Sequence, residues 1–296
     1  MANRCLGICA FAILLLLMQC RYAQSQCGCC AAAFSGAALA AGTSNIGVIK
    51  ENTLRIIGMY RFLHGSRFYN NDSELKKFYD ESLNIHYGGL NLAYGVTTRF
   101  TLETEISSYP DKDLNFGYSR EKISGFSTFA LIGKYTILAD RDNKQEITLG
   151  LGAKLPITNN TTLSGTSGLI YQIFYFKNLN EKYNIIAAHR GEMFVENNTG
   201  FKPGNSFVSS LFVTRILGDG FTGIMELRHD YLSKSEQESE LIQNSGKTVV
   251  SLVPQLTYSL DGYSVSAFIE YPFYKKYVNI QLSEQFGAGL AVIFML

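Results

Sequence analysis

Hydrophobic and polar residues alternate along several segments of this chain with a period of two residues. The clearest segment covers residues 100–107, where one face carries Phe100, Leu102, Thr104 and Ile106 and the other carries Thr101, Glu103, Glu105 and Ser107. Successive side chains of a β-strand point to opposite faces, so this segment is predicted to be a strand with one dry and one wet face. The same rhythm returns in residues 54–63, 147–155 and 286–296.

Together these segments predict an all-β protein with about twelve strands, the even number that bacterial barrels require. We place the strands at residues 53–64, 82–95, 99–109, 124–138, 145–156, 167–177, 182–195, 205–216, 221–232, 247–260, 263–272 and 277–296. Pro254 lies inside the tenth strand, where it removes a donor from the hydrogen-bond ladder, and we expect a β-bulge there.

The connections between the predicted strands alternate between long and short. Long polar connections cover residues 65–81, 110–123, 157–166, 196–204 and 233–246, and short ones cover 96–98, 139–144, 178–181, 217–220 and 261–262. Outer-membrane barrels have short periplasmic turns and long outside loops, whereas a soluble β-sandwich has no reason to sort its loops by length. The pattern predicts a transmembrane antiparallel up-and-down barrel with both termini in the periplasm.

The composition agrees with a barrel that has an apolar outer face and a polar inner face. Hydrophobic residues make up 46% of the chain and the mean hydropathy is +0.03, which is too polar for a bundle of membrane helices. The chain has 18 Tyr and 20 Phe but no Trp, so Tyr and Phe would have to form any aromatic girdle. The net charge of +1 indicates no electrostatic preference for nucleic acid.

The N-terminus has the pattern of a secretory signal peptide. Arg4 supplies the positive region, residues 11–18 an apolar core, and residues 23–25 a small-x-small cleavage site, so we predict cleavage before Gln26. Lipidation at Cys20 is the alternative, but the large Gln19 stands where a small residue normally precedes a lipidated Cys. After residue 25 no run of about 18 apolar residues could form a spanning helix.

Motifs between residues 94 and 156 resemble a known family of barrels. They are Tyr94-Gly95-Val96-Thr97-Thr98-Arg99-Phe100-Thr101-Leu102, Gly133-Lys134-Tyr135 and Leu149-Gly150-Leu151-Gly152-Ala153-Lys154-Leu155-Pro156, with Glu270-Tyr271-Pro272-Phe273-Tyr274 near the end. This set of motifs resembles the outer-membrane transporter family named after the meta-cleavage pathway of phenol degradation. The chain departs from the usual barrel pattern by ending in Leu296 where an aromatic residue is common.

The resemblance implies a FadL-like or porin-like channel for small compounds, hydrophobic ones among them, without naming a substrate. The expected partners of such a channel are outer-membrane lipid, a small-molecule solute and the barrel-assembly machinery. The resemblance implies no cofactor and no binding of nucleic acid. The rival interpretation is a structural or adhesion barrel that acts through its outside loops and would lack conductance. We expect three parts: signal peptide 1–25, a Cys-containing segment 26–50, and barrel 51–296.

Strand parity identifies the charged residues expected on the wet inner face of the barrel. These candidate lumen residues are Arg55, Arg61, Glu103, Glu105, Lys134, Lys154, Arg190, Glu192, Glu226, Arg228 and Glu270. Their mixed signs predict a cross-braced interior and not a purely cationic or anionic pore. Glu103 and Glu105 also have the spacing of a paired acid and base, but this placement is ordinary for a polar lumen.

Three cysteines open the predicted mature chain, at Cys27, Cys29 and Cys30. In an oxidising periplasm, oxidised or structural thiols are favoured over metal capture, since four ligands at zinc-finger spacing are absent. Residues 31–41 are small and apolar. The whole segment 26–50 is either a plug that inserts into the barrel or a periplasmic lead-in, and the sequence leaves both open.

An enzyme is a further rival, because some outer-membrane barrels are lipases built on a Ser and His pair. The chain has four histidines, at His64, His86, His189 and His229, and none lies in a nucleophile motif. No Gly-x-Ser-x-Gly elbow is present. We therefore predict no catalytic residues.

Overall fold

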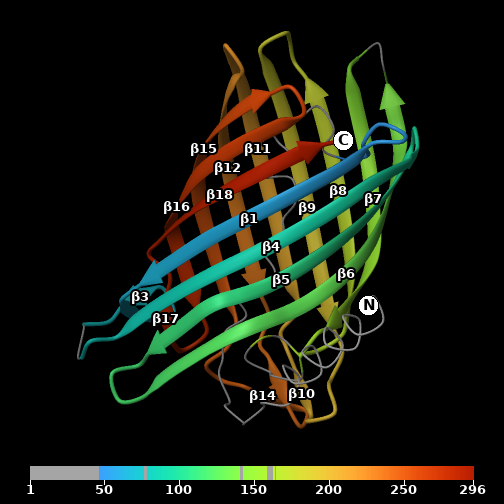
Figure 1. Cartoon of the computed structure of the whole chain (residues 1–296). Coiled ribbons are helices and arrows are strands. Elements are labelled where there is room, and N and C mark those ends of the chain that lie inside the picture. The colour runs from blue at the N-terminus through green and yellow to red at the C-terminus, as the bar shows by residue number, and fades with distance from the viewer. Residues whose placement is uncertain (1–46, 77–78, 141–142, 159–162, 164) are drawn as a thin grey trace, which may run out of the picture.

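The computed structural model describes residues 47–296 except 77–78, 141–142, 159–162 and 164. Twelve strands close into one antiparallel barrel, in the spatial order β1-β18-β16-β15-β12-β11-β9-β8-β7-β6-β5-β4 (Figure 1). They are β1 (Leu54–Gly65), β4 (Ser82–Thr97), β5 (Phe100–Asn115), β6 (Arg120–Asp140), β7 (Gln145–Pro156), β8 (Gly168–Asn178), β9 (Tyr183–Phe194), β11 (Ser206–Gly218), β12 (Phe221–Leu232), β15 (Lys247–Leu260), β16 (Tyr263–Tyr277) and β18 (Phe286–Met295).

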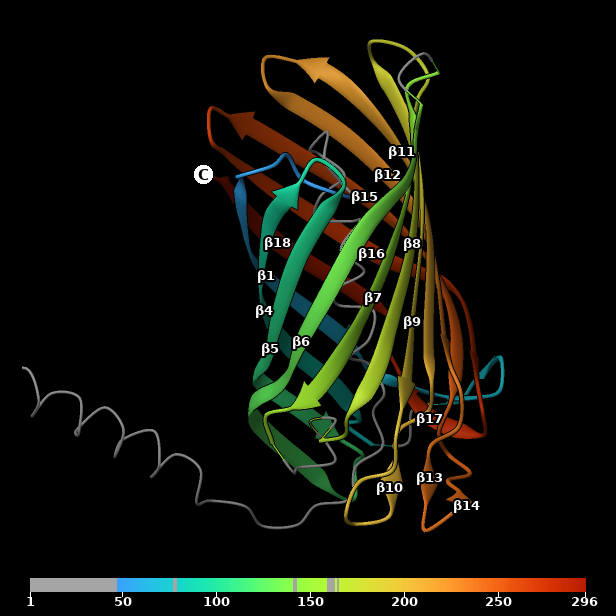
Figure 2. The ribbon, with the colours of Figure 1, turned by 90° about the vertical axis from the view of Figure 1, so that its right-hand side faces the viewer.

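Two small sheets lie beyond one end of the barrel. One contains β2 (Arg67–Asn70), β3 (Ser73–Glu74) and β17 (Ile280–Ser283), and the other β10 (Phe201–Lys202), β13 (Glu236–Gln237) and β14 (Glu240–Leu241). Figure 2 shows β10, β13 and β14 projecting past the barrel at the end away from the C-terminus. We call this end the loop rim.

The opposite end carries both ends of the barrel sequence and is called the terminal rim. Arg55 near the start of β1 pairs with Met295 at the end of β18, which closes the barrel. Tight turns connect strands at this rim, and positive φ angles at Asp219 (49°), Gly220 (81°) and Gly262 (80°) allow the chain to reverse there. The predicted sorting of short and long connections therefore matches the two rims.

Burial alternates along most of the barrel strands. In β1 the odd-numbered residues from Arg55 to Leu63 are buried and the even-numbered ones are not. On the outer surface, aromatic residues mark both edges of an apolar band: Phe221 and Tyr231 on β12, Tyr263 and Tyr271 on β16, and Phe294 and Phe286 on β18 are all at least 40% exposed. The residues of each pair lie eight to ten positions apart, close to the 9–11 residues of a membrane-spanning strand.

The twelve-stranded all-β fold is confirmed, but three details of the expected pattern are wrong. The predicted strand 277–296 contributes only Phe286–Met295 to the barrel, because residues 280–283 pair with β2 outside it. Most of the predicted loop 110–123 is strand, since β5 and β6 continue their pairing from Lys112 and Ile123 outward.

The third detail is the bulge expected at Pro254. Between β15 and β16 the register is the same before and after this residue, with Leu252 opposite Tyr271 and Gln255 opposite Phe268. The register shift lies instead between Val250 and Ser251. The missing proline donor interrupts the ladder locally without adding a residue to the strand.

Candidate functional site: the barrel interior

All eleven charged residues identified by parity lie buried on the inner face of the barrel. None is more than 6% exposed, and every one takes part in an ion pair. Buried charges are tolerated when they are paired and hydrogen-bonded. The pairs form three networks. The first joins β1, β5 and β6, the second joins β5, β7 and β9, and the third joins β1, β12 and β16.

The first network begins at Glu103 on β5. Its carboxylate accepts hydrogen bonds from Arg55 on β1 at 3.2 Å and from Lys134 on β6 at 2.8 Å. The Arg55 side chain passes over β4 to reach it. One carboxylate therefore serves two cations from different strands.

Glu105, two residues further along β5, binds a different partner across the barrel. Arg190 on β9 donates from both terminal nitrogens to the two carboxylate oxygens of Glu105, each at 2.8 Å. Its Nε donates to Glu192 at 2.8 Å, and Glu192 also accepts from Lys154 on β7 at 2.7 Å. The guanidinium is thus held on both sides, a geometry that lysine could not reproduce.

The third network connects strands on the other side of β1. Arg61 donates to Glu270 at 2.5 Å, and Arg228 lies 3.3 Å from the other oxygen of the same carboxylate. Arg228 also binds Glu226 on its own strand through two hydrogen bonds of 2.8 and 2.9 Å. Two residues that the sequence analysis did not single out complete the network, because Ser210 and Gln255 both donate to Glu226.

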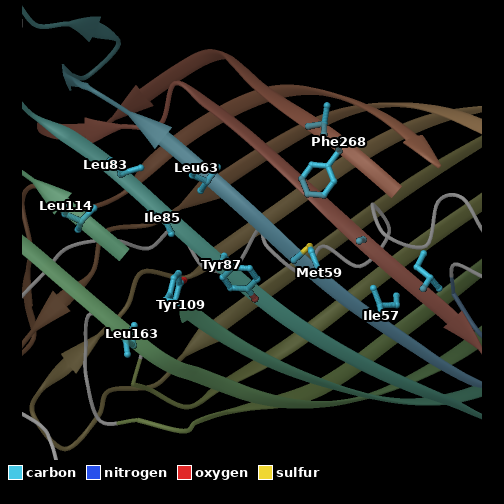
Figure 3. Close-up of a cluster of buried hydrophobic side chains, with 13 residues drawn as sticks. Ile57, Met59, Leu63, Leu83, Ile85, Tyr87, Tyr109, Leu114, Leu163 and Phe268 are labelled. Atoms are coloured by element: carbon cyan, nitrogen blue, oxygen red, sulfur yellow. The ribbon is translucent and has the colours of Figure 1, made fainter. Parts of the chain in front are cut away.

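An apolar stretch of the inner wall was also missed by the sequence analysis (Figure 3). It is formed mainly by β1, β4, β5, β16 and β18, and we call it the apolar wall. Its buried members are Ile57, Met59, Leu63, Leu83, Ile85, Tyr87, Tyr109, Leu114, Leu163, Val253, Phe268, Ala291 and Ile293. The available signal was parity, because Ile57, Met59 and Leu63 alternate in phase with Arg55 and Arg61.

The apolar wall continues towards the loop rim. Partly buried Phe116, Ile123 and Leu282 pack against it there. Phe116 in turn stacks near Phe68 of β2 and Tyr118, at centroid distances of 6.4 Å in both cases, and Tyr118 is 84% exposed. Apolar and aromatic side chains therefore extend from the exposed loop rim into the interior.

Residues 47–49 are buried inside the terminal rim. Ile49 is 1% exposed and its backbone N–H donates to Thr101 Oγ1 on the inner face of β5 at 2.9 Å. A Cβ on Gly47 would lie 2.3 Å from Thr148 Oγ1 on β7, so the chain backbone runs directly against the inner wall. Cys27, Cys29 and Cys30, together with the rest of segment 26–46, are outside the described residues.

One electrostatic cluster lies at the loop rim, beyond the spanning part of the strands. Lys247 donates to Glu284 at 2.5 Å and the Tyr277 hydroxyl donates to the same carboxylate at 2.6 Å. Burial of Glu284 opposes its ionisation, but the attraction of Lys247 and these hydrogen bonds prevail and lower its pKa to about 2. The cluster ties the connection before β18 to the start of β15.

The groups considered for catalysis are not brought together. Glu103 and Glu105 are each engaged with separate cations, and the four histidines are on strand positions of the outward face. Three of them bind neighbouring polar groups there: His64 binds Asn84, His86 binds Tyr60 and His189 binds Ser209. Among the described residues, no group of three or more His, Cys, Asp or Glu side chains could hold a metal ion.

Comparisons with solved structures support the fold. An outer-membrane channel from Pseudomonas putida F1 superposes with a TM-score of 0.72 at 14% identity, covering 86% of this chain and 99% of that chain. The translocator domain of an autotransporter from Neisseria meningitidis gives 0.50 at 12% identity, covering 89% and 95%. At such identities the likeness concerns architecture and not activity.

No protein-family model matches the chain, and neither does any curated protein sequence. The family resemblance noted between residues 94 and 156 is therefore not confirmed by these comparisons. Within the described part of the chain, no helix has the length and apolar character needed to cross a bilayer. In three dimensions this barrel of twelve strands is similar to an outer-membrane channel.

Proposed function

We propose that this protein is an exported outer-membrane channel. The apolar outer band edged by aromatic residues supports a position in a bilayer, where lipid-facing side chains of barrels have this pattern. The sorting of short and long connections onto opposite rims supports an orientation with the terminal rim in the periplasm and the loop rim outside the cell. Fractionation and heat-modifiable gel mobility test this: a protein that carbonate releases from the membrane contradicts it.

We further propose that the channel passes small hydrophobic or amphipathic compounds. The single observation that carries this proposal is the apolar wall, which runs beside the ion-pair networks in the same interior. The members of this wall are buried, so a compound that moves between them meets apolar surface and does not have to displace bound water. A compound with an apolar body and a polar group finds partners for both parts here.

Uptake into liposomes containing the purified protein tests the substrate class. Replacing Ile85 and Met59 together by Gln should lower the uptake of decanoate relative to that of glucose, because both substitutions place amides in the apolar wall. The control, Ile85→Val with Met59→Leu, keeps the wall apolar and should keep the ratio. An unchanged ratio in the Gln variant would argue against the wall as a solute path, and no flux at all would favour a structural or adhesion barrel.

We also propose that segment 26–46 acts as a plug. Support comes from residues 47–49, whose backbone already lies against the inner faces of β5 and β7. Removing residues 26–46 should raise single-channel conductance, whereas a periplasmic lead-in would leave conductance unchanged. Thiol counting with and without reductant, followed by replacement of Cys27, Cys29 and Cys30 by Ser, tests whether the cysteines contribute to assembly or flux.

A further inference from the structure

The Glu105–Arg190 ion pair differs from the other interior pairs in how far around the wall its partners lie. Three strands, β6, β7 and β8, separate β5 from β9 (Figure 2). The other interior pairs join residues on the same strand, on adjacent strands, or across one intervening strand. The Glu105–Arg190 pair is therefore a chord of the barrel.

This chord divides the interior into two unequal sectors at its level. The shorter way around from β5 to β9 crosses four strand spacings, or roughly 19 Å of wall at about 4.8 Å per spacing. The longer way passes β4, β1, β18, β16, β15, β12 and β11, which is eight spacings or roughly 38 Å. We refer to these as the three-strand sector and the seven-strand sector.

The three-strand sector is occupied by its own side chains. Lys134 and Lys154 lie over the rings of Phe174 and Phe194, at 4.9 and 5.1 Å from the ring centroids. Ile132 and Ile170 in this sector are fully buried. The apolar wall, whose members are also buried, belongs mainly to β1, β4, β16 and β18 of the seven-strand sector.

The bridge itself is rigid. Arg190 presents all three guanidinium nitrogens to carboxylate oxygens, two to Glu105 and one to Glu192, each at 2.8 Å. Both Glu105 and Arg190 are at most 5% exposed. A bidentate, buried pair of this kind holds one geometry, whereas an exposed pair would exchange between several.

We propose that the Glu105–Arg190 bridge is the constriction of the channel and confines permeation to the seven-strand sector. It closes the three-strand sector and places a neutralised pair of charges at the edge of the path, so that solutes pass beside the apolar wall. This inference rests on the proposed channel function. It adds two specificity-determining residues and assigns the path to one side of the barrel.

Single-channel recording in planar bilayers tests the bridge directly. Glu105→Ala with Arg190→Ala should raise conductance about twofold or more, because it joins the two sectors. Glu105→Gln keeps the length of the side chain and one acceptor for Arg190, so it preserves the chord and should leave conductance near the wild-type value. An ion pair outside the barrel, Lys202 with Glu236 at 3.3 Å, provides the control when both are replaced by Ala.

Chemical modification of introduced cysteines locates the permeation path without changing Glu105 or Arg190. In a background with Cys27, Cys29 and Cys30 replaced by Ser, Ser266→Cys on β16 and Gln172→Cys on β8 each place one thiol at a buried position, one in each sector. Both native side chains are at most 2% exposed. A small cationic methanethiosulfonate should block current through the Ser266→Cys protein at least about tenfold faster.

The outcomes separate the two levels of the proposal. If the wild-type protein passes neither ions nor solute, the proposed channel function is wrong. If the wild type conducts and the double variant Glu105→Ala with Arg190→Ala has the same conductance, the bridge is not the constriction. It then has only a structural role, even if the variant is less thermally stable. Equal or faster block of the Gln172→Cys protein places the path in the three-strand sector and overturns the assignment.

Discussion

The carboxylate of Glu103 is the point at which loss of one group should cost the barrel most. It holds two cations, Arg55 and Lys134, and the side chains of all three residues are at most 2% exposed. Ion pairs on a protein surface contribute only about 0–1 kcal/mol to the free energy of unfolding. Because this cluster is buried, that range does not apply to it. Glu103→Gln keeps the shape but leaves both cations without this negative partner.

The expected loss of unfolding free energy for Glu103→Gln is about 3–5 kcal/mol, the range for breaking a buried ion pair. Lys134→Met should cost less, because Glu103 retains Arg55. Replacing all three residues, with Arg55→Met, Glu103→Gln and Lys134→Met, should recover much of the loss, since apolar groups of similar volume often substitute for buried ions without penalty.

Urea unfolding in lipid vesicles, followed by heat-modifiable gel mobility, measures these differences. The reasoning depends on the order of the variants, with the single Glu103→Gln less stable than the triple variant. A loss below about 1 kcal/mol for Glu103→Gln would mean that interior water screens these charges as it does at a protein surface. A triple variant as unstable as the single one would refute the origin in unpaired charge.

Two further predictions concern the loop rim and the barrel wall. Glu284→Gln should destabilise the protein at pH 7 by roughly 3 kcal/mol, because the folded pKa of Glu284 is lowered to about 2 from an unfolded value of about 4.5. The wild-type advantage is present above pH 4.5 and disappears as the pH falls from there to 2, so the melting temperatures of both proteins should converge at low pH. Gly65→Ala should reduce folding yield strongly, because the new Cβ would lie 1.8 Å from the Ser283 carbonyl oxygen, whereas Gly58→Ala, with nothing within 4 Å, should refold like wild type.

The sequence alone determined the strands and which of their faces turn inward. Both properties are local: side chains alternate with a period of two residues, and turn residues such as Asp261 and Gly262 interrupt the alternation. The eleven charged residues that parity assigned to the inner face are all buried. The same parity already contained Ile57 and Met59, but a residue-by-residue view gave no reason to group them with Phe268 and Ile293 from distant strands.

The partners of the interior residues were decided only by the tertiary structure. Whether Arg190 meets Glu105, 85 positions earlier, depends on the closure of the barrel and on the tilt and register of every strand between them. The departure of residues 280–283 from the barrel likewise depends on the availability of β2 as a partner. A local alternation states which way a side chain points, and only the closed sheet brings that side chain opposite another.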